Sequence, residues 1–166
     1  MNIEDTFVVV RDSLLAVKYD IHATHEFTRL FNLWNDPEYL HEFFTEHESD
    51  LCNGFFGNIN VEAAVIQTRQ EAKALERKIL HLAKNGRRNK DLSLATLFKP
   101  LTEHPGKFTD MESSKAKGAA SKSWLRIYAI RPLADDLNFF VVSGGTIKLT
   151  RSMQESVHIR RSNCKK

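Results

Sequence analysis

The chain has few cysteines and no long hydrophobic run, and both absences exclude classes of protein. Its 166 residues include two cysteines, Cys52 and Cys164, which form neither a metal-spaced pair nor a disulfide framework. We therefore expect reduced thiols and a cytoplasmic protein. No run of about 18 apolar residues is present, so no transmembrane helix is expected. The N-terminus also lacks the basic, apolar and small-residue regions of a secretion signal.

Motifs for nucleotide and metal binding are missing as well. The sequence has no G-x-x-x-x-G-K-[ST], no G-x-G-x-x-G and no H-E-x-x-H. The segment Ser143-Gly144-Gly145 is too short for a phosphate-cradling loop, and nothing marks a nucleophile elbow. His22 and His25, with Glu26, have donor atoms suited to a metal, but such short histidine pairs are common by chance. We predict neither a metal nor a cofactor.

Acidic residues are scarce in the last third of the chain. Residues 113–166 contain 11 Lys/Arg and 3 Asp/Glu, a net charge of +8, whereas residues 1–83 contain 7 and 14, a net charge of −7. Such a basic region favours a polyanion, which means nucleic acid, an anionic membrane or an acidic protein. Alternatively, the acidic and basic parts of the chain pair with each other within the fold.

The clearest pattern that is present is the strict alternation in the stretch Trp124–Thr150. Leu125 and Ile127 point to one face, whereas Arg126 and Tyr128 point to the other. A strand should therefore run over Trp124–Arg131, because Pro132 cannot donate to a ladder. A second strand over Phe139–Thr150 should pair with it antiparallel. Its adjacent glycines predict a bulge, a bend or the close approach of another backbone.

Helical spacing dominates the chain before this stretch. Residues 61–85 have a narrow apolar stripe between Asn60 and Gly86, which predicts one continuous helix. A second helix should follow Thr24 as its N-cap, and a third should begin at Asp36-Pro37 and continue to Leu51, where Asn53-Gly54 ends it.

The two ends of the remaining sequence complete the predicted organisation. Thr6–Val10 and Leu14–Tyr19 are apolar runs with a polar break, which favours a hairpin over a strand that leads into a helix. Thr102–Ser123 has the composition of a flexible loop, with Ser113–Ser123 as its most mobile part. We therefore predict a single α+β domain over residues 1–166, in which a small antiparallel β-sheet packs against several helices.

Cations near this sheet, with one tyrosine among them, form the candidate site. Arg126 and Tyr128 share a face of one strand; an arginine can hold a phosphate and a tyrosine can stack on a base. Arg131, Lys148 and Arg151 are expected to bind RNA phosphates. Alternatively, Tyr128 belongs to the core and Arg126 to a structural ion pair.

Three residues are the candidates for catalysis at this site. Arg126 would stabilise the negative charge that develops on a phosphate in the transition state. Tyr128, or His158 on a terminal helix, would transfer protons.

The order of these elements resembles the RelE/HigB-type toxins of bacterial toxin–antitoxin pairs. The similarity covers roughly residues 98–160, from Phe98-Lys99-Pro100-Leu101 through a lysine-rich loop to a terminal segment. Trp124-Leu125-Arg126 matches the family's Leu-Arg strand element, and Lys148 with Arg151 matches its Phe-x-Lys-Lys segment, although the adjacent lysine pair is absent.

The resemblance implies a fold, an activity and a partner. It implies a small curved antiparallel sheet on two helices, cleavage of mRNA, often on the ribosome, and inhibition by a helical antitoxin, for example a helix-turn-helix protein. Two other functions stay open. One is a non-catalytic regulator that binds a protein or a nucleic acid. The other is a phage or mobile-element protein that inhibits a host defence.

Overall fold

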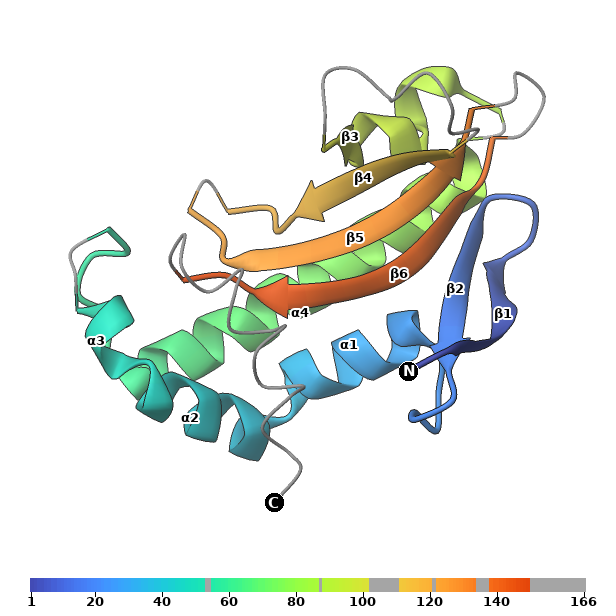
Figure 1. Ribbon diagram of the computed structural model, residues 1–166. Helices are drawn as coiled ribbons and strands as arrows, with labels where there is room; N and C mark the ends of the chain where they lie inside the picture. The colour runs from blue at the N-terminus through green and yellow to red at the C-terminus, as the bar shows by residue number, and fades with distance from the viewer. Residues whose placement is uncertain (53–54, 87, 102–110, 121, 134–137, 150–166) are drawn as a thin grey trace.

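Figure 1 shows a computed structural model of the chain, an α+β fold with a six-stranded mixed sheet and helices α1–α4. The structure describes residues 1–52, 55–86, 88–101, 111–120, 122–133 and 138–149. Within these residues the strand order is β1-β2-β6-β5-β4-β3. None of the helices in these ranges is long and apolar enough to span a bilayer.

The N-terminal hairpin is confirmed. Strands β1 (Ile3–Val10) and β2 (Leu14–Tyr19) pair antiparallel, and Asp12 takes a positive φ of 62° in the turn between them. Aspartate tolerates this left-handed conformation better than most residues do. The buried Ser13 hydroxyl donates to the carbonyl of Ala83, 2.7 Å away, and so ties the hairpin to a distant helix.

Helices α1 (Glu26–Asn35) and α2 (Pro37–Glu46) follow the predicted spacing, but their ends differ in part from the prediction. The N-cap of α1 is His25, whose Nδ1 accepts from the Thr28 amide at 3.4 Å, and not Thr24. Asp36 caps α2 as expected, and Pro37 takes its first position. The continuous helix to Leu51 is wrong, because α2 ends at Glu46 and the short α3 (Glu48–Leu51) follows. The predicted stop at residues 53 and 54 lies outside the described residues.

The longest helix, α4 (Val61–Asn85), has the predicted bounds. The Asn60 side chain accepts from the Ala63 amide at 2.8 Å, which fixes its start. Gly86 follows the end of α4, but its φ of −64° shows that it does not adopt a left-handed conformation there. A Cβ on Gly86 would lie 2.7 Å from Ser93 Cα, so only glycine permits this close approach.

The flexible loop expected over 102–123 is wrong in its second half. After the short helices η1 (Lys90–Leu92) and η2 (Leu94–Thr96) come β3 (Lys99–Pro100) and then β4 (Met111–Lys117). β4 pairs with β5 along its whole length, so Ser113–Lys117 has a regular ladder that its polar composition did not reveal. Residues 102–110 and 121 lie outside the described part of the chain.

The central pair, β5 (Leu125–Pro132) and β6 (Phe140–Ile147), is antiparallel as predicted. The prediction that the whole sheet is antiparallel is wrong. β2 pairs with β6 in parallel, over Leu14–Ala16 and Phe140–Val142. A parallel pair needs a long crossover, and here helices α1–α4 and the later strands lie between the two strands in sequence.

The glycine pair in β6 has two of the three predicted effects, a bulge and a close approach. The register shifts between Tyr128, opposite Gly144, and Ala129, opposite Val142, so Ser143 is the extra residue of a β-bulge. A Cβ on Gly145 would lie 2.7 Å from the Arg126 carbonyl oxygen and 2.8 Å from Leu30 Cδ1. Glycine therefore lets α1 approach β6 closely.

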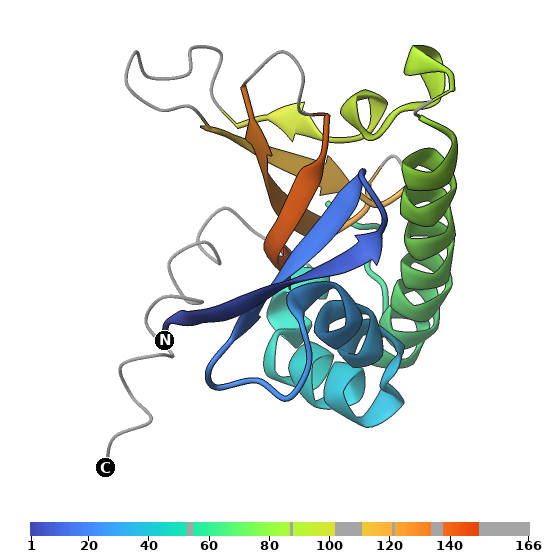
Figure 2. The same cartoon turned by 90° about the vertical axis from the view of Figure 1, so that its right-hand side faces the viewer.

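The hydrophobic core lies between α4 and one face of the sheet. Figure 1 shows α4 behind β4, β5 and β6, and Figure 2 shows it running along one side of the molecule. Trp124 is fully buried, and its indole donates to the Thr68 hydroxyl at 2.9 Å. Phe44 and Phe56 contact its ring edge to face. The other tryptophan, Trp34 on α1, is also buried.

Candidate functional site

The two faces of β5 differ in how well they are covered. Leu125, Ile127 and Ala129 are buried against the core, whereas Arg126 and Tyr128 are half-buried on the opposite face. In the β4 ladder, Lys115 lies opposite Tyr128 and Lys117 lies opposite Arg126. Since directly paired residues share a face, this second face carries lysines beside the tyrosine.

A groove of about 960 Å³ opens beside this face. It follows β6 from Ser143 to Ile147 and continues to Lys148 just beyond the strand, and side chains of α1 and α2 line its other side. The groove exists because β2 pairs with β6 only as far as Val142, so the rest of that β6 edge lies beside α1 (Figure 1). At the point of divergence the Tyr19 hydroxyl donates to the Ser143 carbonyl at 2.8 Å, and so bridges the two strands.

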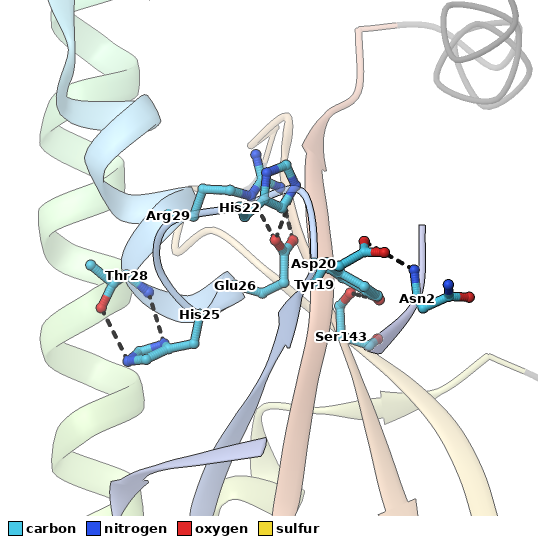
Figure 3. Close-up of polar contacts among 9 residues, drawn as sticks. All are labelled: Asn2, Tyr19, Asp20, His22, His25, Glu26, Thr28, Arg29 and Ser143. Carbon is cyan, nitrogen blue, oxygen red and sulfur yellow. Dashed lines mark hydrogen bonds and ion pairs between the residues drawn. The ribbon is translucent and has the colours of Figure 1, made fainter. Parts of the chain in front are cut away.

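A buried carboxylate lies at the floor of the groove, on the first turn of α1 (Figure 3). The Glu26 side chain is 3% exposed and accepts two hydrogen bonds from Arg29, at 2.6 Å from Nε and 2.8 Å from Nη2. The Nε2 atom of His22 lies 3.7 Å from the same carboxylate. Such a bidentate pair fixes the plane of the guanidinium. Its Nη1 atom takes no part in this pair.

The electrostatics of this cluster follow from the geometry. The pKa of Arg29 is raised above its usual value, chiefly by the hydrogen bond to Glu26, while burial opposes the shift. Glu26, Tyr39 and Tyr19 add smaller favourable charge interactions. Arg29 is therefore a permanent cation whose side chain keeps 27% of its surface exposed.

The α2 side of the groove is aromatic and acidic. Tyr39 and Phe43 stack with ring centroids 6.4 Å apart, and Phe43 and His47 stack at 4.5 Å. These three rings are spaced four residues apart, so they lie on one face of the helix and along its end. Glu42 and Glu46 line the groove beside them.

The structure brings two of the predicted site residues together. Tyr128, predicted as catalytic, and Lys148, predicted as a phosphate ligand, both line the groove, although they belong to different segments. Gly144 lies opposite Tyr128 in the ladder, and a Cβ there would come no closer than 3.8 Å to Glu26 Oε2. The small residue thus leaves the space between the tyrosine and the Glu26–Arg29 pair open.

Arg126 is not directed into the groove as a phosphate ligand. Its Nη1 donates to the carbonyls of Ser123 and Leu125, both at 2.7 Å. Burial lowers the pKa of its guanidinium, while the charges of Tyr128 and Glu71 act in the opposite direction. The alternative prediction for Arg126 was a structural ion pair. The structure instead shows hydrogen bonds from its guanidinium to backbone carbonyls.

Arg131 lies on the other face of the sheet, away from Tyr128. The two residues are an odd number of positions apart on one strand, so their side chains point to opposite faces. The Arg131 guanidinium packs 5.6 Å from the ring centroid of the buried Phe140. The structure therefore does not bring Arg131 together with Tyr128 and Lys148, and its predicted contact with RNA stays a prediction. Arg151 and His158 lie outside the described residues.

The groove contains residues that the sequence did not single out for this role. In the sequence, His22 and Glu26 stand out only as candidate metal ligands, and no motif marks Arg29 or Tyr19. The spacing of Glu26 and Arg29 is that of a helical ion pair, but no local signal tells which element the pair faces. In the described part of the chain, no three His, Cys, Asp or Glu side chains gather as a metal site would require.

No protein-family model, curated protein or solved structure matches this sequence.

Proposed function

We propose that this protein is a cytoplasmic, toxin-type endoribonuclease that binds RNA along the groove beside β6 and is inhibited by a partner protein, for example a helix-turn-helix antitoxin. The observation that supports it most is that Tyr128 and Lys148 meet in one groove with Arg29. The resemblance of residues 98–160 to RelE/HigB-type toxins is consistent with it.

The cations in the α1 and β6 part of the groove suit a single RNA strand. Arg29, held by Glu26, and Lys148 present cations from opposite sides of the groove, and Lys115 and Lys117 continue the positive charge over the neighbouring face. Lysine and arginine neutralise phosphates, and an aromatic side chain such as Tyr128 offers a surface on which a base can stack.

Cleavage of RNA requires no cofactor, because the ribose supplies the nucleophile. The 2′-hydroxyl attacks the adjacent phosphorus, its proton passes to a general base, and the 5′-oxygen leaves with a proton from a general acid. The products are a 2′,3′-cyclic phosphate and a 5′-hydroxyl. Among the groove residues with side chains suited to proton transfer, Tyr128 and His22 are the candidates for this role, because they lie near Arg29 and the β6 part of the groove. Arg29 and Lys148 would stabilise the charge on the phosphate.

A non-catalytic binding module, such as a regulator or an inhibitor of a host defence, is the second candidate. It is favoured by the state of Arg126, whose hydrogen bonds to two backbone carbonyls leave it poorly placed to stabilise a transition state. Binding at Tyr128 and Lys148 would remain in such a protein, but cleavage would not.

The test combines binding, cleavage and growth. The full-length protein is titrated with labelled RNA at several salt concentrations, and Lys148→Gln is compared with Lys78→Gln, an exposed lysine on α4. We expect the Lys148 variant alone to reduce the salt slope by about 0.7, the value for one contact to a single strand. Tyr128→Phe should reduce cleavage more than binding and relieve growth arrest on expression.

Two outcomes contradict the proposal at different levels. Binding without cleavage in any RNA context supports the non-catalytic module. A protein with no affinity for RNA at low salt is not a nucleic-acid-binding protein, and its basic residues must then meet an acidic partner.

A further inference from the structure

Charge differs between two parts of the groove, and this difference limits where a phosphate can lie. Arg29 and Lys148 line the part formed by α1 and β6. The part formed by α2 carries Glu42 and Glu46, which repel phosphates. An RNA strand bound along the groove would therefore place its backbone near the cations and direct an uncharged group toward α2.

The side chains of α2 suit a nucleobase as that group. Tyr39, Phe43 and His47 form a half-buried aromatic surface at the groove, and aromatic surfaces stack on any of the four bases. Stacking alone gives little discrimination. The hydrogen-bonding groups beside the rings must then decide which base binds best.

A carboxylate beside the rings selects for bases with donors. Glu42 is exposed, follows Tyr39 by three positions and immediately precedes Phe43. An ionised carboxylate has only acceptors, so it pairs best with two adjacent N–H groups. Guanine offers such a pair on its Watson–Crick edge, N1–H and N2–H. Adenine and cytosine place an acceptor beside their exocyclic amine, and uracil flanks its single N–H with two carbonyls.

From this arrangement we propose that α2 is a base-reading element and that Glu42 gives the groove a preference for guanine. This proposal rests on the proposed RNA binding and deepens it. Tyr39 and Phe43 supply the stacking surface, Glu42 reads the base edge, and Arg29 with Lys148 holds the neighbouring phosphate without regard to sequence.

The test uses short 2′-O-methyl oligonucleotides, which bind but cannot be cleaved through the 2′-oxygen. The full-length protein is titrated at low salt with UUGUU, UUAUU, UUCUU and UUUUU, and with UUIUU, in which inosine lacks the 2-amino group of guanine. We expect UUGUU to bind about tenfold more tightly than UUAUU, as for a good bidentate pair, with UUIUU between them.

Matched variants assign the preference to its source. Glu42→Gln should abolish the preference for guanine, whereas Glu38→Gln, on the same helix but not lining the groove, should retain it. Arg29→Gln should weaken binding of every oligonucleotide equally and leave their ratios unchanged. This contrast separates base reading from phosphate binding, and folding of each variant is checked by circular dichroism.

The outcomes distinguish the inference from the function on which it rests. Equal affinity of the wild-type protein for all five oligonucleotides overturns base reading while RNA binding stands. A guanine preference that survives in Glu42→Gln overturns the role of Glu42. No binding to any oligonucleotide overturns both proposals, and binding of a hexalysine peptide that is lost in Glu42→Gln would then assign the acidic α2 part of the groove to a basic protein.

Discussion

The two faces of β5 differ in what a substitution there should disturb. On the core face, Leu125 and Ile127 are fully buried together with the preceding Trp124. On the opposite face, Tyr128 borders the groove, and the neighbouring Gly144 leaves space beside it. Residues one position apart in sequence therefore lie in different surroundings, one in the core and the other beside the groove. Substitutions on the two faces should therefore differ in their effect on stability.

The core face should be intolerant of truncation. Trp124→Ala removes a buried ring that contacts Phe44 and Phe56 and leaves the Thr68 hydroxyl without its indole donor. We expect the free energy of unfolding to fall by about 3–5 kcal/mol, as measured by urea denaturation. Tyr128→Ala, on the other face, should cost less than half as much. Equal losses for the two variants would show that both faces belong to one core.

The glycine pair of β6 should divide in the same way. Gly145→Ala places a Cβ 2.7 Å from the Arg126 carbonyl oxygen, so α1 or the ladder must shift, at a cost of about 1–3 kcal/mol. Gly144→Ala meets only Glu26 Oε2 at 3.8 Å, an ordinary contact, and should change stability by less than about 0.5 kcal/mol. Thermal unfolding of the two variants measures the contrast. A larger loss for the Gly144 variant would contradict the described packing of α1.

The smallest expected effect concerns pH and the entry to α1. Burial lowers the pKa of His25, whose ring nitrogen accepts a hydrogen bond from the Thr28 amide. Because the folded protein binds this proton less readily than the unfolded chain, the contribution is present above the unfolded pKa of about 6.5 and is lost as pH falls through the folded value. His25→Asn retains a capping side chain but does not titrate.

The measurement is the free energy of unfolding between about pH 5 and pH 8. The wild-type protein should lose a few tenths of a kcal/mol more than His25→Asn over this range, since a cap on a partly exposed helix end contributes about 1 kcal/mol at most in this setting. Identical pH profiles for the two proteins would exclude His25 as a titrating cap.

The candidate site was only partly predictable from the sequence. Period-two alternation correctly separates Tyr128 from Leu125 and Ile127. It also implies that Arg131 faces away from Tyr128, although both residues belong to the predicted site. Lys148 was chosen for its charge and position after an apolar strand, and it does line the groove. Arg29 and Glu26 were missed, because a helical ion pair looks the same in sequence whether it faces solvent or a groove.

Local sequence patterns predicted the types of several elements and some of their limits. The stripe and cap residues set α4 at Val61–Asn85, the alternation set β5, and Asp36-Pro37 began α2. Each of these patterns involves residues only a few positions apart. Such residues are close together in any fold that contains the helix or strand.

The pairing of the strands and the position of the groove depend on the tertiary structure. The polar segment Met111–Lys117 became a strand because β5 offers it an edge, and β2 joined β6 in parallel for just three residue pairs. Because this pairing is short, the C-terminal part of β6 lies beside α1 and lines the groove. The contacts between β2 and β6 join residues more than a hundred positions apart, and the energy of both pairings depends on complementary surfaces that no local pattern records.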